Sequence, residues 1–429
     1  MPTDRFLIRN GVVIDTEPMP HVRPGAEVLV ENGQIAAVGP KLPDGGATVV
    51  DATDRIVLPG FVDTHRHTCQ TVLRSIAVET DLANYLDLAV RRLAPAFTPD
   101  DVGAANLVGA LECLDSGITT LQDFSHVQYT PEHTEAAVTA LRSAGIRSVF
   151  GYAFPVFDAD ARSPEGVRRA RRDLLADDTD LVTLALAPNG PSFGSMELAA
   201  EDWRLARELG VRLTTHIDSN ETVPRPVAAL REHGLLDGDT LYVHGNTLAD
   251  DELRLIAESG GAMSIAPAVE ARMGHGPAVV GRLRAAGVTT GLGVDVVTTV
   301  AGDMFSLMRA TLLSGHDAGH TDLSAAEVLR MATQDGADAV GLGDRVGSLR
   351  SGKQADLVLL RADDVNLAGG LHDPVGAVVT AAHPGNVDTV LVAGRPVKRD
   401  GRVTGADLAK AVDAATRSAE SLAVRASAR

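Results

Sequence analysis

The chain of 429 residues is poor in cysteine, has no long apolar run and carries no excess of positive charge. Two cysteines, Cys69 and Cys113, exclude a disulfide framework and favour a reducing compartment, which predicts a cytoplasmic location. No apolar run has the length of a membrane span, and the start at 1–5 lacks the basic and apolar regions of a secretory signal. A net charge of −18 argues against partners such as nucleic acid or an anionic membrane.

What the chain does have is a central region in which β-like and helical runs alternate. The expected strands are 61–67, 118–124, 148–152, 181–187, 212–216, 241–244, 262–265 and 290–295. Eight such β/α units predict an α/β fold, a (β/α)8 barrel of the TIM type. An open, doubly wound sheet is the alternative, and the lack of a Gly-x-Gly-x-x-Gly motif after the first strand counts against it.

Both ends of the chain lack this alternation and instead show short β segments separated by turns, such as Asn10-Gly11 and Asn32-Gly33. We expect these two regions to pair in space as one small β-sandwich beside the barrel. The predicted domains are therefore a discontinuous sandwich from 1–56 and 350–429, with a helical tail at its end, and a barrel at 57–349.

The most informative motif closes the first barrel strand, where His65 and His67 are separated by one residue. Side chains alternate along a strand, so residues two apart face the same way. The two imidazoles are therefore spaced to share one metal ion, and imidazole is the commonest protein ligand for zinc. An isolated pair of this kind is a modest signal, so its partners further along the chain decide the interpretation.

Those partners are His216, His244 and Asp295, which end the expected strands five, six and eight. In a parallel barrel all of these ends meet at one rim, where active sites lie. Imidazole and carboxylate donors suit Zn²⁺ or Fe²⁺, either of which lowers the pKa of a bound water. Asp295 could bind the metal and also accept the proton of that water. Each residue alone is better explained as an ordinary core or loop residue, but the joint pattern predicts a metal centre.

The pattern resembles the amidohydrolase superfamily, in which a His-x-His pair ends strand one, His ends strands five and six, and Asp ends strand eight. The run Leu58-Pro59-Gly60-Phe61-Val62-Asp63 before the metal motif is similar to that family as well. Gln70 and the run Gly302-Asp303-Met304-Phe305 resemble the branch of triazine hydrolases and of cytosine, guanine and methylthioadenosine deaminases.

The resemblance implies one metal ion, because the fourth strand at 181–187 lacks the lysine that bridges two ions in other members. It implies His65, His67, His216 and Asp295 as ligands of one divalent ion, with zinc favoured over iron. His244 is expected to polarise the substrate or the attacking water. Members of the family are often oligomers, so a homodimer or larger assembly is expected.

The chain departs from the deaminases of this branch at Ser219, where they carry a glutamate that moves protons. A serine hydroxyl is a poor acid or base near neutral pH, so another group must substitute or the chemistry must differ. Asp218, Glu221 and Glu270 are the candidate substitutes, and Asp295 alone could also suffice. The catalytic candidates are thus Asp295, His244, Glu270 and Ser219, and the substrate-binding candidates are Gln70, His126, Asp218 and His275.

Together these features predict a metal-dependent hydrolase that cleaves a C–N bond of a small heterocyclic compound, as a deaminase or cyclic amidase, by attack of a metal-bound hydroxide. Because Ser219 replaces the usual glutamate, the alternative is another reaction at the same site: decarboxylation, a lyase reaction or displacement of a halide. A non-catalytic scaffold ranks last, since every expected ligand is present.

Overall fold

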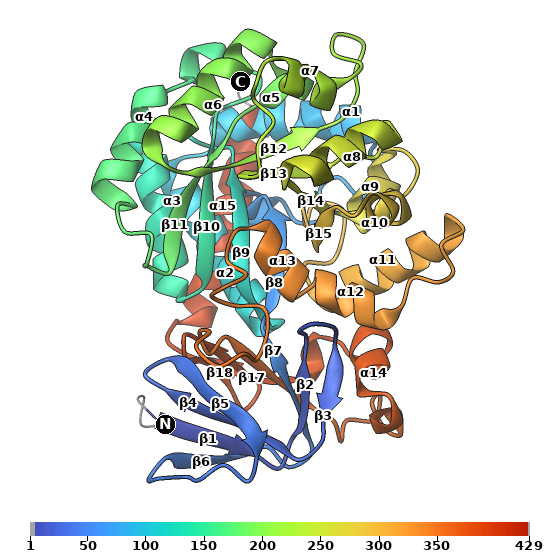
Figure 1. The fold of residues 1–429 in the computed structure, drawn as a ribbon. Coiled ribbons are helices and arrows are strands. Elements are labelled where there is room, and N and C mark those ends of the chain that lie inside the picture. The colour runs from blue at the N-terminus through green and yellow to red at the C-terminus, as the bar shows by residue number, and fades with distance from the viewer. Residues whose placement is uncertain (1–4, 428–429) are drawn as a thin grey trace.

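Eight parallel strands form the centre of the computed structural model, which describes residues 5–427 (Figure 1). They pair in chain order, and each is buried along most of its length because helices cover its outer side and side chains fill the interior. The strands are β8 (Phe61–Arg66), β9 (Ile118–Ser125), β10 (Arg147–Ala153), β11 (Val182–Ala187), β12 (Arg212–Ile217), β13 (Thr240–His244), β14 (Ala262–Ile265) and β15 (Thr289–Leu292).

The barrel closes just beyond the ends of its first and last strands. The backbone N–H of His67 donates to the carbonyl of Asp295 at 2.9 Å, and the N–H of Asp295 donates to the carbonyl of His65 at 2.8 Å. These two bonds join the chain after β15 to β8, so the predicted (β/α)8 barrel is confirmed. They also bring two strand ends that carry metal-type side chains side by side.

Helices surround the barrel, and their ends follow local sequence signals. Helix α2 begins at a capping box formed by Thr98 and Asp101, while α3, α6 and α8 end at glycines with left-handed backbone. The helices that follow barrel strands or lie between them are α2 (Pro99–Asp115), α3 (Pro131–Ala144), α4 (Pro164–Arg169), α5 (Gly190–Phe193), α6 (Met196–Leu209), α7 (Pro226–Glu232), α8 (Asp250–Ser259), α9 (Pro267–Met273), α10 (Val280–Ala286), α11 (Met304–Asp317), α12 (Ala325–Met331) and α13 (Gln334–Ala339).

Strands from both ends of the chain build two small sheets at the foot of the barrel, as predicted (Figure 1). One sheet contains β5 (Gln34–Pro40), β4 (Ala26–Glu31), β1 (Arg5–Arg9) and β6 (Thr48–Asp51) in that order. The other contains β19 (Arg402–Val403), β18 (Arg395–Arg399), β17 (Val387–Val392), β16 (Leu357–Arg361), β7 (Arg55–Pro59), β2 (Val12–Asp15) and β3 (His21–Arg23). The antiparallel pairing of β7 with β16 joins the two ends of the chain.

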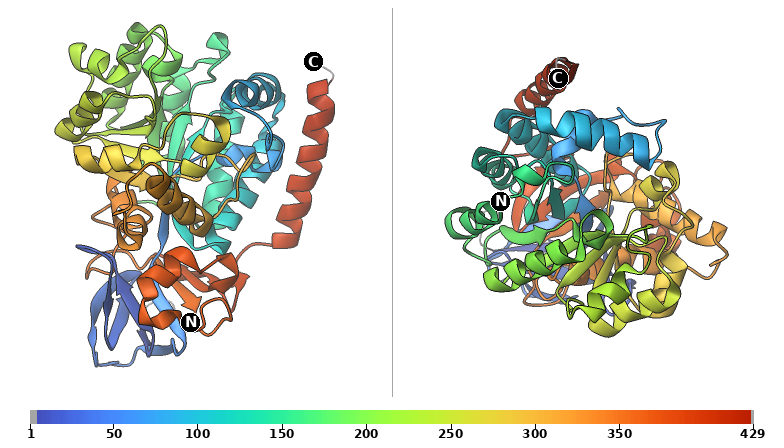
Figure 2. Two further views of the ribbon diagram at one scale, coloured as in Figure 1. Left: turned by 90° about the vertical axis from the view of Figure 1, so that its right-hand side faces the viewer. Right: turned by 90° about the horizontal axis from the view of Figure 1, so that it is seen from above.

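The last helix, α15 (Leu408–Ser427), leaves these sheets and runs along the side of the barrel (Figure 2). It packs on α2, where the Ser418 hydroxyl donates to Asp101 Oδ1 at 2.6 Å. Helix α14 (Pro374–Thr380) instead lies beside the terminal sheets. Within residues 5–427, no helix is both long and apolar enough to cross a membrane.

Candidate active site

Three imidazoles converge at the carboxyl ends of the barrel strands. His65 lies on β8, His67 follows it directly, and His216 lies on β12. One ring nitrogen of each lies within 4.8 Å of those of the other two. Burial lowers the pKa of all three imidazoles, so they are neutral near pH 7 and their lone pairs are free to bind a cation.

Asp295 completes this cluster from the segment after β15. Its carboxylate Oδ1 lies 3.4 Å from His65 Nε2 and 3.5 Å from His67 Nε2. Its backbone has φ of 65°, a left-handed conformation that a residue with a side chain adopts at a cost. The two backbone bonds at the barrel seam hold Asp295 in this conformation, which turns its carboxylate toward the histidines.

The donor set fits a zinc ion. Two ligands of a tetrahedral zinc, each about 2.0–2.1 Å from the ion, lie roughly 3.3–3.4 Å apart. The distances from Asp295 to His65 and His67 match that spacing. Both ring nitrogens of His65 are fully buried and have no hydrogen-bond partner within residues 5–427, which is costly for a polar group, and a bound cation would satisfy Nε2, the nitrogen near Asp295.

His244 ends β13 on the opposite side of the cluster, also with left-handed backbone, at φ of 73°. Its Nδ1 lies 3.2 Å from Glu270 Oε1, and its Nε2 lies 3.8 Å from Asp295 Oδ2. Burial opposes charge on this imidazole, but Glu270, Asp295 and Asp218 outweigh it and raise its pKa to about 9. His244 is thus held as a hydrogen-bond donor beside the metal-type cluster.

Hydrogen bonds from behind fix the orientation of His67. Its Nδ1 lies 3.1 Å from the carbonyl of Phe124 and 2.9 Å from His126 Nδ1. His126 in turn lies 3.3 Å from the amide nitrogen of Gln70, which donates to the Tyr85 hydroxyl at 2.8 Å. Such contacts set which ring nitrogen of a ligand histidine faces the metal.

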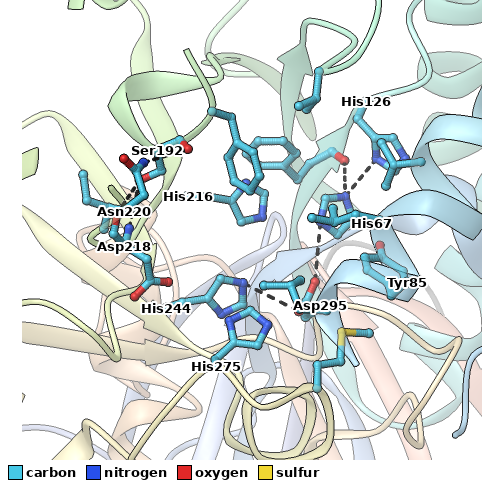
Figure 3. A pocket seen from close by; sticks show the side chains of 18 of the residues that line it. His67, Tyr85, His126, Ser192, His216, Asp218, Asn220, His244, His275 and Asp295 are labelled. Carbon is cyan, nitrogen blue, oxygen red and sulfur yellow. Dashed lines mark hydrogen bonds and ion pairs between the residues drawn. The ribbon is translucent and has the colours of Figure 1, made fainter. Parts of the chain in front are cut away.

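A pocket of about 250 Å³ opens over the cluster (Figure 3). It is lined by His67, His216 and Asp295 from the cluster and by His244, His126, His275, Asp218 and Ser219 around it. The remaining lining residues are Leu82, Tyr85, Leu86, Val90, Phe124, Val156, Ser192, Phe193, Ile217, Asn220 and Met273. The pocket therefore joins a polar floor to walls that are largely apolar.

The loop after β12 places Asp218 and Ser219 differently. Asp218 Oδ1 accepts the Thr247 hydroxyl at 2.7 Å and the Thr247 backbone N–H at 3.0 Å, while Oδ2 has no hydrogen-bond partner among the described residues. The Ser219 hydroxyl donates to the Thr247 carbonyl at 3.2 Å. Burial raises the pKa of the Asp218 carboxyl group above its ordinary value, against the opposing effect of His244 and of the bonds from Thr247.

The structure brings most of the predicted site residues together but leaves two behind the pocket wall. Glu270, on α9, is buried and does not line the pocket, because it accepts the Ala266 N–H at 2.7 Å and faces His244. Gln70 is likewise buried behind Tyr85 and His126. Both side chains hold neighbours that do line the pocket.

Sequence reasoning did not single out the apolar wall. Leu82, Tyr85, Leu86 and Val90 line the pocket from helix α1 (Leu82–Tyr85) and the π-helical segment Leu86–Leu93. Their spacing of three, four and eight residues is that of one helical face, which was a usable signal. Phe193 and Met273 carry no comparable pattern.

Comparisons with known proteins identify the family of this chain. The model of the Amidohydrolase family matches residues 56–397. A 5-methylthioadenosine/S-adenosylhomocysteine deaminase from Symbiobacterium thermophilum is 30% identical, over 92% of this chain and 94% of its own length.

Two solved structures are similar as well. An adenosine deaminase from Xanthomonas campestris with bound zinc has a TM-score of 0.89 at 27% identity, covering 98% of both chains. Zinc-bound atrazine chlorohydrolase from Arthrobacter aurescens TC1 has a TM-score of 0.87 at 25% identity, covering 96% of this chain and all of the other.

The chain belongs to the amidohydrolase family. The predicted family is thereby confirmed, and with it the class of a metal-dependent hydrolase, since the histidine cluster that could hold an ion is in place.

Proposed function

We propose that this chain is a zinc-dependent deaminase that replaces an amino group on a heteroaromatic ring by oxygen and releases ammonia. The observation that carries the proposal is the presence, in one pocket, of the metal-type cluster and of a second carboxylate, Asp218. The deaminases among its relatives support the same reaction class.

His65, His67, His216 and Asp295 would hold one zinc ion. When bound, zinc supplies Lewis acidity and makes hydroxide available at neutral pH. The roles that follow belong to the chain's own groups. Asp295 takes a proton from the attacking water as the carbon–oxygen bond forms, and it returns this proton to the amino group as the carbon–nitrogen bond breaks.

Asp218 is the proposed second acid in place of the missing glutamate. Asp218 lines the pocket, its Oδ2 has no hydrogen-bond partner among residues 5–427, and burial raises the pKa of its carboxyl group, so this oxygen is placed to exchange a proton with a ring nitrogen. Protonation of that nitrogen makes the neighbouring carbon more electron-poor, and the remaining O–H proton of the intermediate returns to Asp218 as the ring carbonyl forms. Ser219 is given a structural role, because its hydroxyl and its backbone N–H are both bonded to Thr247.

Two histidines complete the polar floor. His244 donates a hydrogen bond to negative charge that develops on the reacting group, with Glu270 fixing its orientation. His275 Nε2 is buried without a partner in the described part of the chain, and burial lowers the pKa of this imidazole to about 4, so a neutral ring faces the substrate. His126 and Gln70 are positioning residues that orient His67 and Tyr85.

Displacement of chloride from a ring is the second candidate, favoured by the likeness to a chlorohydrolase and by the serine at position 219. A matched pair of s-triazines, one with an amino group and one with chlorine at the same ring carbon, separates the two reactions. Zinc-loaded protein is expected to release ammonia from the first faster than chloride from the second. Chloride release alone would contradict the deaminase proposal.

A further inference from the structure

Much of the wall of the pocket is apolar. Leu82, Leu86 and Val90 recur every four residues along one helical face, so they present a continuous apolar strip to the cavity. Val156, Phe193 and Met273 extend this wall from other segments. Phe193 is 39% exposed and its ring lies 6.0 Å from that of His216, so the apolar surface runs from the cluster to the mouth of the pocket.

Positive charge on the residues that line the pocket is confined to its floor, where His244 is paired with Glu270. Among the described residues that line it there is no lysine and no arginine, whereas Asp218 and Asp295 are both carboxylates. A carboxylate or phosphate placed against the apolar wall would lose its water without gaining a counter-charge. Anionic and zwitterionic substituents are therefore disfavoured beyond the ring that reacts.

The polar side chains outside the floor already have partners. Asn220 donates to the Ser192 carbonyl at 3.1 Å and accepts the Val223 N–H at 2.6 Å. The Ser192 hydroxyl donates to the Asp218 carbonyl at 2.9 Å.

The Tyr85 hydroxyl also has a partner, because it donates to Gln70 Oε1 at 3.0 Å. Unused hydrogen-bonding capacity is concentrated at Asp218 Oδ2 and at His275 Nε2, whose ring lies 4.4 Å from that of His244. Polar recognition is thus available to the reacting ring and scarce for its substituent.

From this division we infer that the substrate is a small aminated heteroaromatic ring with a neutral, apolar substituent, such as an alkyl chain, and that a ribose or a charged chain is selected against. The inference rests on the proposed deaminase function. The cavity has a volume of about 250 Å³, just below the range of roughly 300 to 1,000 Å³ that ligand pockets commonly span. It therefore suits a small compound.

The expected discrimination follows from transfer and hydrogen-bond energies. Each buried methylene strengthens binding by about fourfold. Each sugar hydroxyl buried without a partner weakens it by roughly five- to 150-fold. A butyl group in place of ribose on the same ring is therefore expected to raise kcat/KM by at least about tenfold.

The test compares two substrates that share one aminated purine: adenine with a butyl group on the ring nitrogen that bears ribose in adenosine, and adenosine itself. Ammonia release by zinc-loaded, full-length protein is measured for both, and binding of both is measured by calorimetry. Faster release from butyladenine supports the inference. Equal release, or faster release from adenosine, overturns it.

The binding measurement separates this inference from the proposed function. If neither compound releases ammonia but butyladenine binds more tightly, deamination of this ring is refuted while the apolar preference stands. If neither releases ammonia and binding shows no preference, both ideas fail.

A matched pair of variants assigns the preference to the wall. Leu86→Asn places an amide in the apolar strip and is expected to lower the butyl-to-ribose ratio of kcat/KM by about fivefold or more. Leu88→Asn is the control, because Leu88 is also half-buried on the same segment but does not line the pocket. An equal ratio in both variants would contradict the role of the wall.

Discussion

Replacing Asp218 by asparagine tests the proposed substitute for the missing glutamate. An amide cannot donate a proton to a ring nitrogen as a carboxylic acid does, yet it has nearly the same shape. We expect Asp218→Asn to lower kcat by about 10²- to 10⁴-fold, the usual contribution of a positioned acid or base. That range corresponds to about 3–5 kcal/mol in the activation free energy.

The fold is expected to tolerate this change. The amide oxygen can still accept both hydrogen bonds from Thr247, at 2.7 and 3.0 Å in the wild type, so the loop after β12 keeps its anchor. The free energy of unfolding is therefore expected to fall by less than about 1 kcal/mol. Zinc content is expected to stay at the wild-type level, because Asp218 is not among the proposed ligands.

The assay is steady-state ammonia release by zinc-loaded protein, with Ser219→Ala as the matched control. Loss of the Ser219 hydroxyl removes one bond to Thr247 and no proton carrier, so kcat is expected to change by less than about threefold. Equal losses in the two variants, or full activity in Asp218→Asn, would refute the assignment of the proton to Asp218.

Three further predictions concern the surroundings of the site. Glu270→Gln is expected to lower kcat by about 10- to 100-fold at unchanged zinc content, because it weakens the contact that orients His244; kcat and elemental analysis check this. Arg66→Met leaves the buried Asp63 without its charge partner and is expected to lower the free energy of unfolding in urea by about 3–5 kcal/mol. Arg74→Met removes a more exposed pair with Glu112 and is expected to lower it by less than about 1 kcal/mol. Burial raises the pKa of Asp202 from its ordinary 3.8 to about 6 in the folded protein, despite Arg162. The protonated carboxyl group therefore contributes fully to the free energy of unfolding below pH 3.8, and this contribution is lost as the pH rises through 6. Relative to Asp202→Asn, the free energy of unfolding of the wild type is expected to fall by on the order of 1 kcal/mol between pH 5 and 7. A difference between the two proteins that stays constant over this range would contradict this prediction.

The barrel could be predicted because its strands are buried on both faces and therefore appear as apolar runs bounded by turns. β14 lies at Ala262–Ile265 as predicted, and β13 begins one residue before the prediction. The eighth strand is shorter than predicted, since β15 ends at Leu292. Asp295 lies beyond the end of this strand, with a left-handed backbone conformation that no pattern of residues in the sequence predicts.

The metal-type residues could be predicted because parallel strands deliver their carboxyl ends to one rim. Side-chain direction in the following loops could not, since it depends on local partners. Glu270 follows strand seven as a pocket residue should, yet the Ala266 N–H and His244 turn its carboxylate behind the wall. The strip of Leu82, Leu86 and Val90 is visible as a helical spacing, but the sequence does not say which surface it faces.

The most direct test of the account is the zinc content of the purified protein and of two histidine variants, measured by elemental analysis. About one zinc per chain is expected in the wild type and in His275→Ala, since His275 lines the pocket without belonging to the ligand cluster. His216→Ala is expected to lose the metal. Equal zinc in the wild type and His216→Ala would contradict the metal centre on which the proposed chemistry depends.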